Sequence, residues 1–418
     1  MAGFLSIRDW LGRNRAGSRL ASVGLLLWSA SLPFAMAQSV RFTSVFLFVI
    51  AGGFLLHCLA HGFHFFRISL ADFKLILPLM LLAVLPLLHF FSGYNKRELL
   101  LLAPLFFVPW MLFYLKEEFP RMLQRGVLLS LAASCLVLVL LLTAKNPLLV
   151  WHSVRSEQEL PDIFLLARPQ MGLLTGLLFF LSVHFLILQK KLWRMLLPLM
   201  VAAGILFWIL AKMAIIALGI SILFLSFILL KNRPLVLVVS SGFLMIMVIS
   251  GAIWLFQSGL PQEALSRDGL SFQKYPKAMV NSINSRIVLW KAGKDVLMES
   301  SGLICGIPSA QLELKLKAAT ANYNAYLAGQ NLNPHNQPLY VLLHYGFAGL
   351  LVLLLIWYRL FEKVRKYPAL LAAVLFLLIC SQSEIYLDRE FGTQLFMLVF
   401  IVFGLLPVNK SKDRTHIT

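Results

Sequence analysis

Long apolar runs separated by short polar segments fill the chain from end to end. An apolar run of about 20 residues is long enough to cross a bilayer as a helix. Lys212 divides the longest run, 193–230, into two. The pattern predicts about twelve membrane-spanning helices, centred on 20–37, 43–61, 72–91, 98–115, 126–143, 168–188, 194–210, 212–230, 234–256, 337–358, 368–387 and 390–408.

One polar segment, 257–336, is much longer than a turn and separates the ninth predicted span from the tenth. Within it, residues 285–299 and 309–328 have the composition and pattern of helices. A loop of this length with its own helices is usually functional. The expected organisation is therefore nine spans, a large loop with short helices, and three further spans with a tail, in residues 1–256, 257–336 and 337–418.

Composition supports the membrane class. Apolar residues make up 60% of the chain and charged residues 13%, whereas soluble domains average about 45–50% and about 25%. The formal net charge of +19 is compatible with nucleic-acid binding, but the Lys and Arg residues form short clusters between apolar runs. That distribution indicates membrane lipids as neighbours and no nucleic acid.

The basic residues also predict the orientation. With the N-terminus inside, twenty Lys and Arg residues fall in inner segments and eight in short outer segments. Because basic residues accumulate on the cytoplasmic side, both termini are expected in the cytoplasm and loop 257–336 outside it. One alternative remains: the first run ends in Ala35-Met36-Ala37, which is similar to a signal-peptidase site. Cleavage there would remove the first predicted helix.

A histidine stands where the long loop meets the tenth span, in Asn333-Pro334-His335-Asn336. Imidazole titrates near neutral pH and can accept a proton from an attacking hydroxyl. Pro334 and Pro338 restrict the backbone around it. The alternative is a histidine that caps the helix or lies at the membrane interface.

Four cations fall on the same predicted side of the membrane as His335, namely Arg168, Lys212, Arg286 and Arg389. Each alone can be explained by a solvated helix face, an outer turn or an interfacial anchor. Together they suit a diphosphate leaving group, because cations that converge on a phosphate stabilise its developing charge.

Glu384, Asp388 and Arg389 lie between the last two predicted spans. Acidic residues at a membrane edge need partners, and two pairings are open: with the cations above or with one another. No P-loop, Asp-rich metal motif, dinucleotide turn or zinc spacing of Cys and His occurs. We therefore expect no metal and no cofactor.

Two motifs resemble those of the O-antigen ligase and polymerase superfamily. One is His335-Asn336-x-x-Leu339 followed by Leu342-Leu343-x-Tyr345-Gly346-x-x-Gly349-Leu350, and the other is Ser285-Arg286-x-x-x-Trp290, about fifty residues earlier. Twelve predicted spans with a large loop between the ninth and tenth also match this superfamily.

The resemblance implies a GT-C-like, metal-independent glycosyltransferase of the bacterial inner membrane with a periplasmic active site. Such enzymes move a glycan from undecaprenyl diphosphate to an acceptor, which in the ligases of lipopolysaccharide biosynthesis is lipid A–core oligosaccharide. It implies His335 as the base and Arg286 as a diphosphate ligand. Lys212 stands where the family usually has arginine, so the charge is kept and the bidentate fork is lost. Arg168 is expected to share the phosphate-binding role. Five further residues are expected to support the site: Asn336, Trp290, Arg389, Asp388 and Glu384.

Three functions fit these observations. The first is an O-antigen ligase with an inverting mechanism. The second is an O-antigen polymerase or a protein O-oligosaccharyltransferase of the same superfamily, which differs in its acceptor. The third, from another class, is a transporter of a lipid-linked glycan. Transporters carry ionisable residues near the bilayer midplane and inverted repeats, and the predicted spans contain almost no charge and no repeat.

Overall fold

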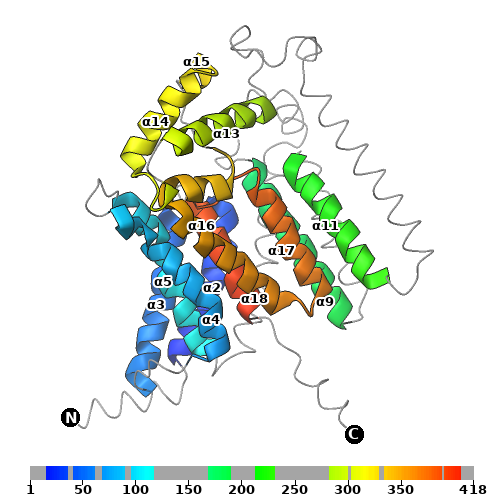
Figure 1. Cartoon of the computed structure of the whole chain (residues 1–418). Coiled ribbons are helices and arrows are strands. Elements are labelled where there is room, and N and C mark those ends of the chain that lie inside the picture. The colour runs from blue at the N-terminus through cyan, green and yellow to red at the C-terminus, as the bar shows by residue number, and fades with distance from the viewer. Residues whose placement is uncertain are drawn as a thin grey trace.

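The computed structural model describes the chain in ten segments: 16–35, 41–61, 68–89, 96–116, 168–189, 212–230, 282–299, 303–328, 334–387 and 390–405. All regular secondary structure in these segments is helical (Figure 1). The elements are α2 (Ala16–Ala35), α3 (Arg41–His61), α4 (Leu70–Val84), the 3-10 helix η2 (Leu85–His89), α5 (Lys96–Lys116), α9 (Arg168–Gln189), α11 (Lys212–Leu230), α13 (Ser282–Glu299), α14 (Ser309–Ala321), α15 (Ala325–Ala328), α16 (Gln337–Val364), α17 (Pro368–Ser381) and α18 (Glu390–Leu405).

Helices occupy nine of the twelve predicted spans. The other three predictions, at 126–143, 194–210 and 234–256, fall outside the described segments. Within those segments, three helical stretches are long and apolar enough to cross a membrane: Leu70–His89, Glu98–Leu115 and Gln337–Val364. Shorter apolar helices accompany them. The regular structure of the described segments is thus entirely helical, and the apolar helices are those expected of a polytopic membrane protein.

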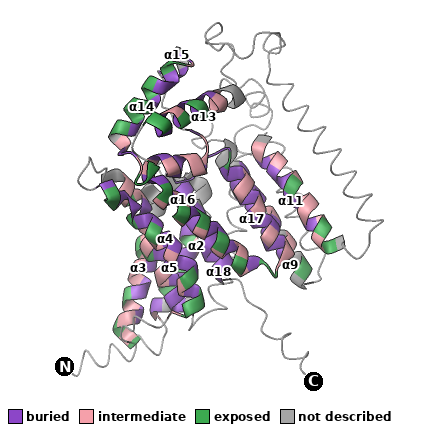
Figure 2. Ribbon diagram, in the orientation of Figure 1, coloured by how far each residue is buried: buried purple, intermediate pink, exposed green. Residues whose placement is uncertain are grey.

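One apolar core joins the long helices, and Figure 2 shows its buried residues along the faces where helices meet. α2 and α3 approach so closely that a Cβ atom on Gly17 would lie 2.4 Å from the backbone nitrogen of His57. One polar contact crosses this core: the Trp28 indole donates a hydrogen bond to the Gln394 amide oxygen at 3.0 Å, joining α2 to α18. Such pairing avoids the cost of burying an unsatisfied polar group.

α9 and α17 are antiparallel neighbours. The ring of His184, near the end of α9, lies 5.5 Å from that of Tyr367, just before α17 begins. Earlier in α9 and later in α17, the rings of Phe180 and Phe376 lie 5.8 Å apart. The beginning of α9 therefore lies at the end of the bundle where α17 finishes.

α13, α14 and α15 gather at one end of the bundle, over the first part of α16 (Figure 1). Their own apolar cluster includes Val296 of α13 and Leu316 of α14, and it extends to Leu343 of α16. Close approach is possible because Gly293 faces α16, where a Cβ atom would lie 3.1 Å from Leu339. The sequence predicted helices in both of these loop segments.

α16 is broken at Gly346, whose φ of 61° and ψ of −158° are not helical. A break leaves backbone groups without their helical partners, and other segments supply them. The Leu343 carbonyl accepts from Ile307 N–H at 2.8 Å, and Ala348 N–H donates to the Ile304 carbonyl at 3.4 Å. His89 Nε2 donates to the His344 carbonyl at 2.8 Å. The break is thus a fixed feature that docks the loop onto α16.

Two predicted boundaries were wrong. The span predicted over 368–387 ends as a helix at Ser381, and residues 382–387 instead run past the start of α16. Their backbone makes hydrogen bonds to a side chain of α16, which competes with a continued helix. The helix predicted over 309–328 is interrupted at 322–324, where the Asn324 side chain accepts from Leu327 N–H at 2.9 Å and starts α15.

Candidate active site

One face of α13 carries the two side chains that reach the end of the long loop. Arg286 and Trp290 are four residues apart, so they project from the same side of the helix. Arg286 forms an ion pair with Glu384, and the Trp290 indole donates a hydrogen bond to the Pro334 carbonyl at 2.8 Å. This spacing therefore directs both side chains of the Ser285-Arg286-x-x-x-Trp290 segment toward the end of the long loop.

Glu384 contacts both the proposed phosphate ligand, Arg286, and the candidate base, His335. One carboxylate oxygen pairs with Arg286, and the other lies 3.4 Å from Nδ1 of His335. The Glu384 side chain is 10% exposed, and that of Arg286 is 14% exposed. Of the two pairings left open by the sequence, the structure shows Glu384 paired with a loop cation.

The backbone of His335 is held in an unusual conformation. Its φ of 46° is the only positive value at a non-glycine residue in the described segments. Residues other than glycine occupy this region infrequently, and the strain persists only where surroundings enforce it. The next residue supplies part of that restraint: the Asn336 side chain accepts from Leu339 N–H at 2.8 Å and donates to the Gln382 carbonyl at 3.0 Å.

Gln337 secures the other side of this turn from a fully buried position. Its amide oxygen accepts hydrogen bonds from the backbone N–H groups of Tyr386 and Leu387, at 2.7 and 3.2 Å. Burial raises the pKa of the neighbouring Tyr386 phenol well above its ordinary value, so this side chain stays neutral beside Glu384. Residues 334–337 and 382–387 are thereby fixed to each other.

The His335 imidazole is only partly buried. The His335 side chain is 40% exposed, while the contact to Glu384 is made by Nδ1. If Nδ1 carries the proton toward the carboxylate, Nε2 is left with its lone pair and can accept a proton. A carboxylate that orients an imidazole in this way is a recurrent arrangement for general-base chemistry.

For two other predicted site residues, Arg168 and Lys212, the structure gives the position of the backbone. Arg168 is the first residue of α9, and the antiparallel packing of α9 on α17 puts that helix end on the same side of the bundle as Glu384. Lys212 is the first residue of α11, which packs against α9 and α17. The structure does not describe the side chains of either residue, and Asp388 and Arg389 lie outside the described residues.

The sequence did not single out Gln337 or a second polar group near the start of α5. There, Glu98 accepts a hydrogen bond from the Ser309 hydroxyl, lies 3.6 Å from Nδ1 of His344 and accepts from the Tyr345 hydroxyl at 3.5 Å. The sequence feature that could have indicated this group is the acidic residue Glu98 at the edge of a predicted span. These contacts tie α5 and α14 to α16 next to its break.

Comparison with known families gives one match. A family model described as O-antigen ligase matches residues 197–354. This region includes α11, α13 to α15 and most of α16, together with Lys212, Arg286 and His335; Arg168 and Glu384 lie outside it. No curated protein matches the chain.

Proposed function

Because residues 197–354 match the O-antigen ligase family model, we propose that the chain is an O-antigen ligase. In this proposal the donor is a glycan on undecaprenyl diphosphate and the acceptor is lipid A–core oligosaccharide. The enzyme lies in the bacterial inner membrane with both termini in the cytoplasm, and the site faces the periplasm. The observation that carries the proposal is the contact of His335 with a carboxylate that is itself paired with Arg286.

His335 is the proposed general base. An acceptor hydroxyl gives its proton to Nε2 of His335 while its oxygen attacks the anomeric carbon of the donor sugar. The bond from that carbon to the diphosphate breaks, and undecaprenyl diphosphate leaves with the bonding electrons. The attack from the face opposite the leaving group inverts the anomeric configuration. Glu384 orients the imidazole and stabilises the imidazolium that the proton transfer creates.

The cations are proposed to hold the departing diphosphate. Arg286 is fixed by Glu384 and has further donor groups, because a guanidinium carries five N–H bonds. Arg168 and Lys212 begin helices, and the positive end of a helix dipole adds to the charge of each side chain. This part of the proposal predicts that cations from three separate helices meet one diphosphate. Asn336 and Trp290 support the site by fixing the turn that carries His335.

The test uses the purified full-length protein with the lipid-linked donor and lipid A–core acceptor, in detergent. We expect glycan transfer by the wild-type protein and none by His335→Ala, although both reach the membrane in equal amounts. His61→Ala, the same substitution at the exposed end of α3, is the matched control and should retain activity. Full activity of His335→Ala would overturn the role of the base, and no turnover by the wild-type protein would favour transport.

The acceptor is tested in cells. A strain lacking a ligase accumulates lipid-linked polymer and makes lipopolysaccharide without O-antigen, whereas a strain lacking a polymerase adds one repeat to its core. Gels of lipopolysaccharide from a deletion strain therefore separate the ligase from the polymerase. Unchanged lipopolysaccharide together with loss of a protein-linked glycan would point to the protein O-oligosaccharyltransferase.

A further inference from the structure

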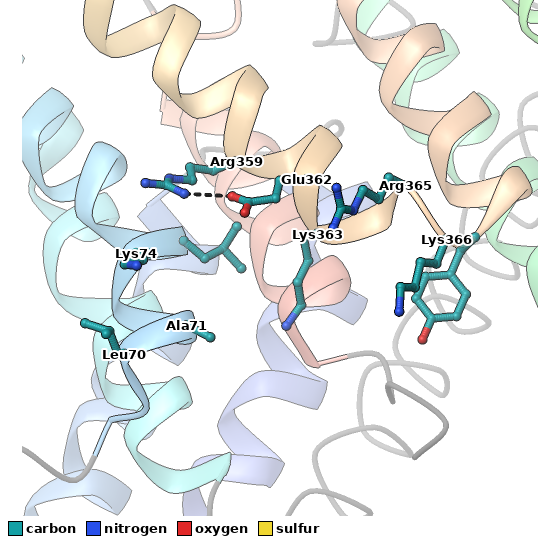
Figure 3. Close-up of a pocket in the computed structure, with 10 residues that line it drawn as sticks. Leu70, Ala71, Lys74, Arg359, Glu362, Lys363, Arg365 and Lys366 are labelled. Atoms are coloured by element: carbon teal, nitrogen blue, oxygen red, sulfur yellow. Dashed lines mark hydrogen bonds and ion pairs between the residues drawn. The ribbon is translucent and has the colours of Figure 1, made fainter. Parts of the chain in front are cut away.

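A second candidate site lies at the far end of α16 from His335. A cavity of about 580 Å³ opens between the beginning of α4, the end of α16 and the short link to α17 (Figure 3). Its lining consists of Leu70, Ala71, Lys74, Leu75, Arg359, Glu362, Lys363, Arg365, Lys366 and Tyr367. None of these residues belongs to the candidate active site.

The two sites are separated by about the thickness of a bilayer. α16 runs from its break at Gly346 to Val364, and a helix of that length rises roughly 27 Å at 1.5 Å per residue. The hydrocarbon core of a bilayer is about 30 Å thick. A bilayer spanned by this part of α16 would thus have the cavity at the surface opposite to the candidate active site.

Positive charge dominates the cavity. Arg359 pairs with Glu362 at 2.7 Å, and Lys363 lies 3.6 Å from the carboxylate of Asp72. The other three cations of the lining, Lys74, Arg365 and Lys366, have no carboxylate within ion-pair distance among the described residues. Three like charges around one cavity repel one another unless an anion lies between them.

An apolar wall faces the cations at the end of α16. Leu70, Ala71 and Leu75 line the side formed by α4, and Leu70 is 68% exposed. In Figure 3, Lys74 of α4 lies across the cavity from the basic residues of α16. A free phosphate ion would use only the cations, whereas an amphiphile with an anionic head and an apolar body would use both surfaces. Basic pockets between helices at the inner membrane surface suit anionic lipid head groups.

We propose that the cavity between α4 and the end of α16 binds the phosphodiester head group of an anionic phospholipid, held by Lys74, Arg365 and Lys366. The acyl chains would continue along the apolar surface of α4. This inference does not depend on the transferase activity, because it concerns the opposite end of the bundle and uses none of the active-site residues.

The experiment measures lipid bound to the purified full-length protein by native mass spectrometry after titration with phosphatidylglycerol or phosphatidylcholine. We expect preferential retention of phosphatidylglycerol. A cation close to an anionic lipid surface changes the affinity about fivefold, so the double variant Lys74→Gln/Lys366→Gln should lose roughly 25-fold. Arg365→Gln is the second variant, with an expected loss of about fivefold, and it keeps the test decisive if the double variant does not fold.

The matched control is Lys315→Gln/Lys317→Gln, which removes the same charge from exposed positions of α14. It should bind phosphatidylglycerol as the wild type does. Equal losses in the control and in the cavity variants would show general electrostatic attraction and overturn the proposal. Displacement of the lipid by millimolar inorganic phosphate would also overturn it, because the ligand would then be the free anion. Persistence of lipid binding in such phosphate, with the expected loss in the variants, supports the lipid.

Discussion

A carboxylate oxygen of Glu384 lies 3.4 Å from Nδ1 of His335, although 49 residues separate them in the chain. The other oxygen of the same carboxylate pairs with Arg286. One buried acid therefore contacts both residues that the family resemblance assigns to chemistry. This relationship makes the two roles interdependent, and it can be tested one residue at a time.

Glu384→Gln should lower the rate of glycan transfer on the order of 10²-fold with little change in KM for the acceptor. The amide cannot stabilise the imidazolium formed by proton transfer, and contributions of this kind are about 10²–10⁴-fold. Steady-state kinetics of the purified protein measure the effect. Glu384→Asp, which keeps the charge, should recover part of the loss. An equal loss in both variants, or a change in KM alone, would argue against the positioning role.

Arg286→Lys should weaken binding of the lipid-linked donor while changing the stability of the fold little. Lysine can keep the ion pair with Glu384, but it lacks the planar fork that binds phosphate oxygens bidentately. We expect KM for the lipid-linked donor to rise and kcat to fall, with the thermal unfolding temperature nearly unchanged. If this variant had the kinetic constants of the wild type, Arg286 would not be a ligand of the diphosphate.

Trp290→Phe tests the hydrogen bond that holds the turn before His335. The phenyl ring keeps most of the packing and loses the donor to the Pro334 carbonyl. One hydrogen bond contributes about 0.5–1.5 kcal/mol, so the free energy of unfolding should fall by about that amount. Transfer activity should fall further than stability does, because the turn carries the base. Activity that simply follows the amount of folded protein would show that Trp290 is structural alone.

Gly346→Ala should destabilise the protein markedly. At this residue φ is positive, and a Cβ atom would lie 2.3 Å from the Ile304 carbonyl oxygen. Strain of this kind costs about 1–3 kcal/mol before any displacement of the loop. Gly52→Ala in α3 is the control, since nothing lies within 4 Å of its Cβ position. Thermal unfolding in detergent compares the two, and equal stabilities would contradict the role given to the break in α16.

The sequence by itself determined the class of the protein and most of its helices. Apolar runs of bilayer length are a local property, because a helix satisfies its own backbone hydrogen bonds and needs only an apolar stretch to enter lipid. The same holds for Arg286 and Trp290, whose four-residue spacing gives them a common helix face. His335 was found because it stands at the edge of an apolar run in a recognisable motif.

Only the tertiary structure decided which partner each of these residues has. Glu384 had two open pairings, and the choice of Arg286 depends on α13 docking over the start of α16. The end of α17 at Ser381 was missed because the hydrogen bonds that fix 382–387 come from Gln337, 49 residues away from Tyr386. Contacts between distant segments are set by packing, and no local pattern of apolar and polar residues encodes them.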